Sequence, residues 1–169
     1  MRPQRSIFPA IALLCLPVIE TSSSPESCLL PVGAGSFKAT SLNRIPQTPC
    51  YLATSNVKVL IEETSYPLGY WAMRSIFASL SNDIGAHPVT EPMSSTLLWY
   101  FGEYPYNNTE LFVRMQHDIM TWGQWEGATN ILAFFYDTFS TVSLSFEVWS
   151  SLDGVQRLAQ GRFSLYDRI

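Results

Sequence analysis

The spacing of apolar residues in the second half of the chain changes from a helical to a strand-like period. From residue 121 to about residue 139, apolar side chains recur at steps of three or four, which places them on one helical face. They are Trp125, Ala128, Ile131, Leu132, Phe134, Phe135 and Phe139. Thr121 and Gln124 have capping-box spacing, so the helix is expected to begin at Thr121. We expect the rest of the chain to pack against the unit that this helix forms with the residues up to Leu165.

A β-hairpin is predicted to follow that helix. The residues from 142 to 149 alternate between apolar and mostly polar side chains, as in a half-buried strand. The apolar set is Val142, Leu144, Phe146 and Val148. Asp153-Gly154 supplies a turn, and the return strand is expected over residues 155–165. Gly161 inside that strand predicts a bulge or a bend.

The first half of the chain repeats a strand followed by a helix. Alternation over residues 57–62 predicts a strand, and 64–67 is interpreted as a helix start because proline is tolerated in a first turn. Gly85 is placed to end the helix. Residues 95–102 and 110–117 predict two further strands. The helical stripe consists of Met73, Ile76, Phe77, Leu80 and Ile84.

These elements have the order β-α-β-β-α-β-β. The steps from Ile61 to Trp71 and from Met115 to Trp125 both span ten residues, which hints at two related halves. We therefore predict an α+β fold of the ferredoxin-like sandwich type. It would have an antiparallel sheet of four to five strands with both helices on one face.

The N-terminus has the layout of a secretory signal peptide. Arg2 and Arg5 precede an apolar run and then small residues. The run is too short to span a bilayer as a mature helix, so no stable membrane span is predicted. The alternative is an apolar arm of a cytosolic protein. We predict a signal peptide at 1–23, an irregular arm at 24–54 and a single α+β domain at 55–169, in a secreted protein.

Cysteines and a glycosylation sequon agree with an extracellular location. Cys15 would leave with the signal peptide, and Cys28 and Cys50 remain as an even pair. In an oxidising compartment they are expected to form a disulfide. The alternative is two free thiols. Asn107 begins the triplet Asn-Asn-Thr and is a predicted glycosylation site.

Composition argues against several classes of function. The net charge is −4 and the pI about 5.1, with no basic stripe, so nucleic-acid binding is not expected. The sequence has no G-x-S-x-G motif, no P-loop and no G-x-G-x-x-G motif. Two histidines and a disulfide leave no usual metal-ligand set. We predict neither a cofactor nor a metal.

Catalytic candidates are weak. His117 precedes Asp118 and is the one histidine beside a carboxylate, so it could act as a general base. A structural histidine at the end of a strand is the better interpretation. Glu147 is the other weak candidate. On balance the sequence favours a protein that is not an enzyme.

The sheet face turned away from the helices is the more informative surface. In the predicted fold it carries Leu60, Phe112, Arg114, Glu147 and Trp149. Phe112, Arg114 and Trp149 are the candidate binding residues. An apolar patch of this kind is larger than a monomer usually exposes. The N-terminal arm could cover it, a second subunit or another protein could dock on it, or the sheet could close into a barrel around a small apolar ligand.

Short motifs in the C-terminal two-thirds resemble those of a group of uncharacterised small secreted-type proteins of filamentous ascomycete fungi. The motifs are the Thr-Trp-Gly helix start at Thr121, the Phe-Glu-Val strand at Phe146 and the Asp-Gly turn at Asp153. The resemblance implies a fungal secreted protein. It implies no activity and therefore no catalytic residues.

Two functional hypotheses follow from the sequence. The preferred one is a small secreted, non-catalytic, effector-like interaction module, which could also form a homodimer through the open sheet face. The alternative is a small-molecule-binding α+β barrel, or a cyclase- or isomerase-type enzyme of secondary metabolism that uses His117, Arg114 or Glu147.

Overall fold

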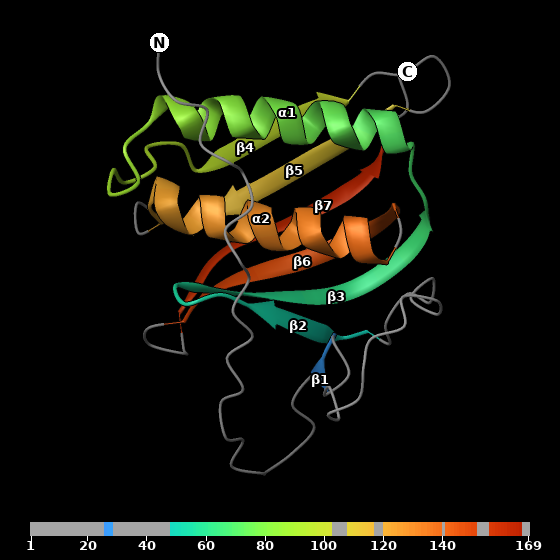
Figure 1. The fold of residues 1–169 in the computed structure, drawn as a ribbon, viewed down its shortest axis with the longest axis horizontal. Coiled ribbons are helices and arrows are strands. Elements are labelled where there is room, and N and C mark those ends of the chain that lie inside the picture. The colour runs from blue at the N-terminus through green and yellow to red at the C-terminus, as the bar shows by residue number, and fades with distance from the viewer. Residues whose placement is uncertain are drawn as a thin grey trace, which may run out of the picture.

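The computed structural model describes residues 26–28, 48–102, 108–116, 120–139, 141–151 and 156–166. These residues form one sheet with the strand order β1-β2-β3-β6-β7-β5-β4 (Figure 1). β1 pairs with β2 in parallel, and the other neighbouring strands are antiparallel. The elements are β1 (Glu26–Ser27), β2 (Cys50–Ala53), β3 (Val57–Pro67), α1 (Tyr70–Ala86), β4 (Leu97–Gly102), β5 (Thr109–Met115), α2 (Trp122–Thr138), β6 (Val142–Ser150) and β7 (Arg157–Leu165).

The two helices cover the same face of the sheet, as Figure 1 shows. α1 lies over β4 and β5, and α2 lies over β3. The predicted class, an α+β fold with a sheet and two helices, is confirmed. No helix among the described residues is long and apolar enough to cross a membrane.

The predicted ferredoxin-like order of four to five strands is not confirmed. In the described part of the chain the sheet has seven strands, and β6 and β7 lie between β3 and β5. The hairpin that follows α2 therefore enters the sheet as a unit beside β3. Strand order depends on pairing between residues far apart in the chain, which local apolar periodicity does not specify.

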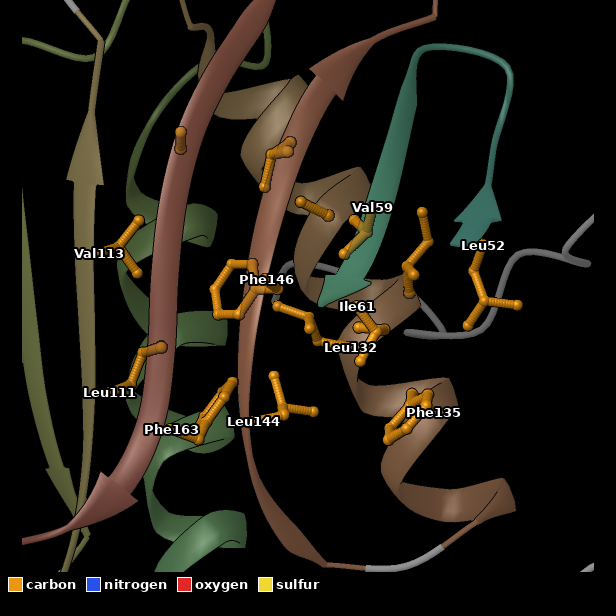
Figure 2. Close-up of a cluster of buried hydrophobic side chains, with 14 of the residues drawn as sticks. Leu52, Val59, Ile61, Leu111, Val113, Leu132, Phe135, Leu144, Phe146 and Phe163 are labelled. Carbon is orange, nitrogen blue, oxygen red and sulfur yellow. The ribbon is translucent and has the colours of Figure 1, made fainter. Parts of the chain in front are cut away.

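Helix α2 is the centre of the hydrophobic core. Its predicted capping box is confirmed. The backbone amide of Gln124 donates to Thr121 Oγ1 over 3.3 Å, and the backbone amide of Thr121 donates to Gln124 Oε1 over 3.0 Å. The side chains of Trp125, Leu132 and Phe135 are fully buried. Figure 2 shows Leu132 and Phe135 beside the inward-facing side chains of the sheet. This packing fixes which face of each strand points inward.

Three boundary predictions are wrong. The segment expected to begin the first helix belongs to β3, whose pairing with β6 extends to Pro67, and α1 begins at Tyr70 after Gly69. In that pairing Thr64 lies opposite Leu144 and Pro67 lies opposite Val142, with a register shift between them, so the segment is held in the sheet. Gly85 does not end α1, which continues to Ala86. The range 24–54, predicted to be irregular, contains β1 and β2, and β2 pairs along its length with β3.

The predicted disulfide is present. Cys28 and Cys50 are bonded, with their Cα atoms 4.9 Å apart, and both side chains are buried. The bond joins the end of β1 to the start of β2. Residues 1–23, the predicted signal peptide, lie outside the described part of the chain.

Glycines in the sheet mark close approaches rather than bends. A Cβ atom at Gly161 would lie 2.5 Å from Cζ of Phe146, so the missing side chain leaves room for that ring. The register shift between β6 and β7 occurs instead at Val148 and Trp149. A Cβ atom at Gly102 would lie 2.0 Å from the backbone oxygen of Ala72. Gly102 therefore lets β4 approach the backbone of α1.

Replacement of Gly102 by alanine should lower the free energy of unfolding by about 2–3 kcal/mol, because the new methyl group would displace α1 from β4. Gly85→Ala is the matched control, since nothing lies within 4 Å of its Cβ position. The control should be neutral or stabilising by up to about 1 kcal/mol, because alanine is the better helix former. Urea unfolding of both variants measures the difference. Equal stabilities would contradict the close contact between α1 and β4.

Candidate functional site

Alternation along the strands separates a buried face of the sheet from a helix-free face. On β5, Leu111 and Val113 are fully buried beneath the helices, whereas Phe112 between them is only partly buried. The same alternation places on the helix-free face the five residues that were predicted to lie there, namely Leu60, Phe112, Arg114, Glu147 and Trp149. β7 divides them into two groups, with Phe112 and Arg114 on one side and Leu60, Glu147 and Trp149 on the other.

A patch of neighbouring apolar side chains covers the β4 end of this face. We call it the aromatic patch, and it consists of Leu97, Trp99, Phe101, Phe112 and Tyr166. The exposed fractions of Leu97, Trp99 and Phe101 are 46%, 52% and 42%. The Trp99 ring centroid lies 5.2 Å from that of Phe101 and 6.1 Å from that of Phe112. Phe101 lies 5.1 Å from Tyr166. The patch therefore runs continuously from β4 and β5 to Tyr166, the residue that follows β7.

A buried carboxylate holds the patch in place. Glu110 on β5 is only 6% exposed. The indole nitrogen of Trp99 donates to Glu110 Oε2 over 3.0 Å, and the Ser164 hydroxyl donates to Oε1 over 2.9 Å. Arg162 forms an ion pair with the same carboxylate over 3.5 Å. A buried charge is tolerable when it is paired and hydrogen-bonded, and here the same bonds fix the Trp99 ring.

Glu147 is the centre of a similar arrangement on β6. It is 9% exposed, the indole nitrogen of Trp149 donates to its Oε2 over 3.0 Å, and Arg157 forms an ion pair with its Oε1. Both carboxylate oxygens thus have partners within the protein. The geometry makes Glu147 an anchor for Trp149 and Arg157.

Glu62 lies near this second cluster. Burial, followed by the negative charge of Glu147, raises the pKa of the Glu62 carboxyl above its ordinary value, while Arg157 acts in the opposite direction. Lys58 on the same strand lies with its Nζ 4.1 Å from the centre of the Tyr51 ring, and burial lowers its pKa. This end of the face is therefore polar, in contrast to the aromatic patch.

A groove of about 700 Å³ lies on the other side of the sheet, between α1 and α2. Tyr70, Arg74 and Phe77 line it from α1, and Asn130 and Phe134 line it from α2. Glu147 and Arg114 do not line it, because they lie on the helix-free face. No group of three or more His, Cys, Asp or Glu side chains in the described ranges could hold a metal ion.

Two predicted positions, His117 and Asn107, lie outside the described residues. Arg114 is exposed, and the described residues provide it with no ion-pair partner. The sequence prediction missed β4 and Glu110 as parts of the site. Because residues 97–101 are apolar at every position, the segment gave no sign of which side chains face water.

Comparisons with protein-family models, curated proteins and solved structures found no match for this chain.

The raised pKa of Glu62 predicts a pH-dependent effect of Glu62→Gln. The folded state binds the proton of the Glu62 carboxyl more tightly than the unfolded state does. Protonation of Glu62 therefore stabilises the fold fully below about pH 4, and this contribution is lost as the pH rises through the folded-state pKa. Glutamine does not titrate. The melting temperature of the variant minus that of the wild type should therefore be more positive at pH 7 than at pH 3. A difference in melting temperature that is equal at both pH values, or larger at pH 3, would contradict a raised pKa of Glu62.

Proposed function

We propose that this protein is a small secreted, non-catalytic, effector-like interaction protein that binds an extracellular partner protein through the aromatic patch. The observation that carries the proposal is the group of half-exposed apolar side chains on β4, fixed to a sheet whose other face is packed against two helices.

The exposed area of the patch is large enough to matter energetically. Taking about 200 Å² per aromatic side chain, the exposed parts of Trp99 and Phe101 together present roughly 200 Å². At 25 cal/mol per Å², complete burial of that area would contribute about 5 kcal/mol. Tryptophan and other aromatic residues are also the types enriched in the energetically dominant parts of interfaces. The composition of the patch therefore fits a protein-binding surface.

The patch is also pre-organised. Glu110 holds the indole of Trp99, and Phe101 packs against Tyr166. Side chains that are already ordered lose little conformational entropy on binding, which raises affinity. Exposed Arg114 stands directly across from Leu97 in the strand pairing, so the rim of the patch is positively charged on that side. A partner with an apolar centre and an acidic rim would complement it.

An extracellular location is supported by three features. The N-terminal segment has the layout of a signal peptide, and the disulfide between Cys28 and Cys50 is typical of an oxidising compartment. Asn107 supplies a glycosylation sequon. The resemblance to small secreted-type fungal proteins agrees with this proposal and suggests a fungal source.

A second candidate function is the binding of a small amphipathic molecule in the groove between α1 and α2. The groove has the volume of a ligand site and combines aromatic with polar lining residues. Glu147 and Arg114 lie across the sheet from it. The groove therefore supports a binding site and offers no support for a cyclase- or isomerase-type reaction that uses those two residues.

Secretion can be tested by intact-mass analysis of protein expressed in a eukaryotic host. The medium should contain a species that lacks about the first 23 residues, gains the mass of two hydrogens on reduction and loses mass on deglycosylation. Asn107→Gln should abolish the last change. Protein retained in the cells with Met1 intact and free thiols would contradict the secretion proposal.

The binding surface can be tested with a photo-crosslinking amino acid at position 97, compared with one at exposed position 126 on α2. We expect a specific adduct with an extracellular protein from the first position only. With that protein purified, Phe101→Ser should weaken binding by about thirtyfold or more, as expected for an interface hot spot. Tyr66→Ser is the matched control, because Tyr66 is a similarly exposed aromatic residue on β3. Equal adducts at both positions, or equal affinities of the two variants, would overturn the proposal.

A further inference from the structure

The outer edge of β4 is the feature that points beyond the proposed function. β4 is the last strand of the sheet and pairs only with β5 among the described strands. The Met115 amide donates to the Thr96 carbonyl over 2.9 Å, and this bond shows which residues of β4 direct their backbone groups towards β5. Antiparallel ladders bond alternate residues, so Leu98, Tyr100 and Gly102 direct their backbone groups to β5. Leu97, Trp99 and Phe101 direct theirs outward.

Ser95 occupies one end of this outward row. Its hydroxyl donates to the Leu97 carbonyl over 2.6 Å and accepts from the Leu97 amide over 3.3 Å. Among the described residues, the backbone groups of Trp99 and Phe101 have no such partner. The free part of the edge is therefore a segment centred on Tyr100.

Within the part of the chain that the structure describes, this edge lacks the usual protection against strand pairing. Natural edge strands carry charges, prolines or bulges, or are very short. β4 has the sequence Leu-Leu-Trp-Tyr-Phe-Gly, and its register with β5 continues without a shift from Leu97 to Gly102. Exposed edges of this kind pair readily with another strand.

We propose that two copies of this chain pair through β4, antiparallel, about a twofold axis at Tyr100. In an antiparallel pair, opposed residues point to the same face, and both must direct their backbone groups across the junction to be hydrogen-bonded. A twofold axis at Tyr100 places Trp99 opposite Phe101 of the second copy and Phe101 opposite Trp99 of the second copy. The four residues thereby use the free groups of both edges, while Ser95 ends the pairing at Leu97.

Side chains are compatible with this register. On the helix-free face, each Trp99 meets a Phe101, and aromatic cross-strand pairs stabilise sheets. On the helix side, Leu98 lies opposite the small Gly102 of the second copy. β4 carries no charge, so no like charges are opposed. A partner with a charged strand would gain no matching charge from β4, and this favours a second copy.

The dimer has a single continuous sheet, and the two aromatic patches become one surface. Both helix-free faces stay open, so the pairing is independent of the partner proposed for the patch. Because the pairing segment is short, we expect an interface at the low end of specific complexes, roughly 1,200 Å², and a dimer that dissociates on dilution.

Sedimentation equilibrium of the wild-type protein tests the proposal first. We expect a concentration-dependent monomer–dimer equilibrium. The double variant Trp99→Lys/Phe101→Lys should shift dissociation to at least tenfold higher concentration, because like charges would be opposed twice. In the monomer, both new lysines would lie near Glu110, so the fold should be retained. The matched control is Tyr70→Lys/Trp71→Lys, which changes two exposed aromatics on α1 and should dimerise like the wild type.

Cysteine cross-linking tests the register. Tyr100→Cys would place two thiols on Cα atoms about 4.5 Å apart across the axis, within the range of a disulfide. Leu98→Cys would separate the two Cα atoms by roughly 14 Å, which is too far. Oxidation should therefore cross-link the first variant and not the second. A monomer at all concentrations, or equal cross-linking of both variants, would overturn the proposal and leave the partner-binding test of Phe101→Ser unaffected.

Discussion

The packing of two helices on one face of a twisted sheet constrains the rest of the fold, and no helix among the described residues covers the other face. Trp125, Leu132 and Phe135 of α2 lose all solvent contact against the inward-facing strand residues. Apolar burial of this extent is the dominant favourable term in folding. Once it fixes the inward set, alternation sends every second residue of each strand to the helix-free face. The unusual features of the protein lie on that face.

The helix-free face contains two buried glutamates that are satisfied in the same manner. Glu110 accepts a hydrogen bond from Trp99 and is paired with Arg162, and Glu147 accepts one from Trp149 and is paired with Arg157. In both cases an indole shields the carboxylate while the carboxylate fixes the indole. The difference lies in the surroundings. Glu110 is surrounded by exposed aromatic side chains, whereas Glu147 lies near the polar Glu62 and Lys58, which explains why one cluster suits binding better than the other.

The two edge strands of the sheet, β1 and β4, differ in how easily another strand could pair with them. β1 has only two residues and is followed directly by a cysteine that is bonded to β2, so it offers almost no template for pairing. β4 is longer, apolar and regular, and its side chains are exposed on the face. The same strand thus carries both the exposed aromatic rings and the backbone groups that have no partner among the described residues. This coincidence links the proposed partner surface to the proposed dimer without making either depend on the other.

Local sequence patterns were enough to predict the individual elements. The capping box of Thr121, the helical stripes and the alternation in β5 and β6 are set by short-range chemistry, and each is present in the structure. The bond between Cys28 and Cys50 is also present, although it was expected from the cysteine count and an oxidising compartment and not from local chemistry. Four further features depend on contacts between distant parts of the chain. Insertion of the β6–β7 hairpin beside β3 set the strand order, and the pairing of Pro67 with Val142 extended β3 through the expected helix start. Trp71 and Trp125 each lie ten residues after an apolar strand residue, yet Trp71 is 56% exposed and Trp125 is fully buried. The aromatic patch also depends on tertiary structure. In a strand that is apolar at every position, the sequence does not indicate which face is exposed to solvent until the place of the strand in the sheet and the covering helix are known.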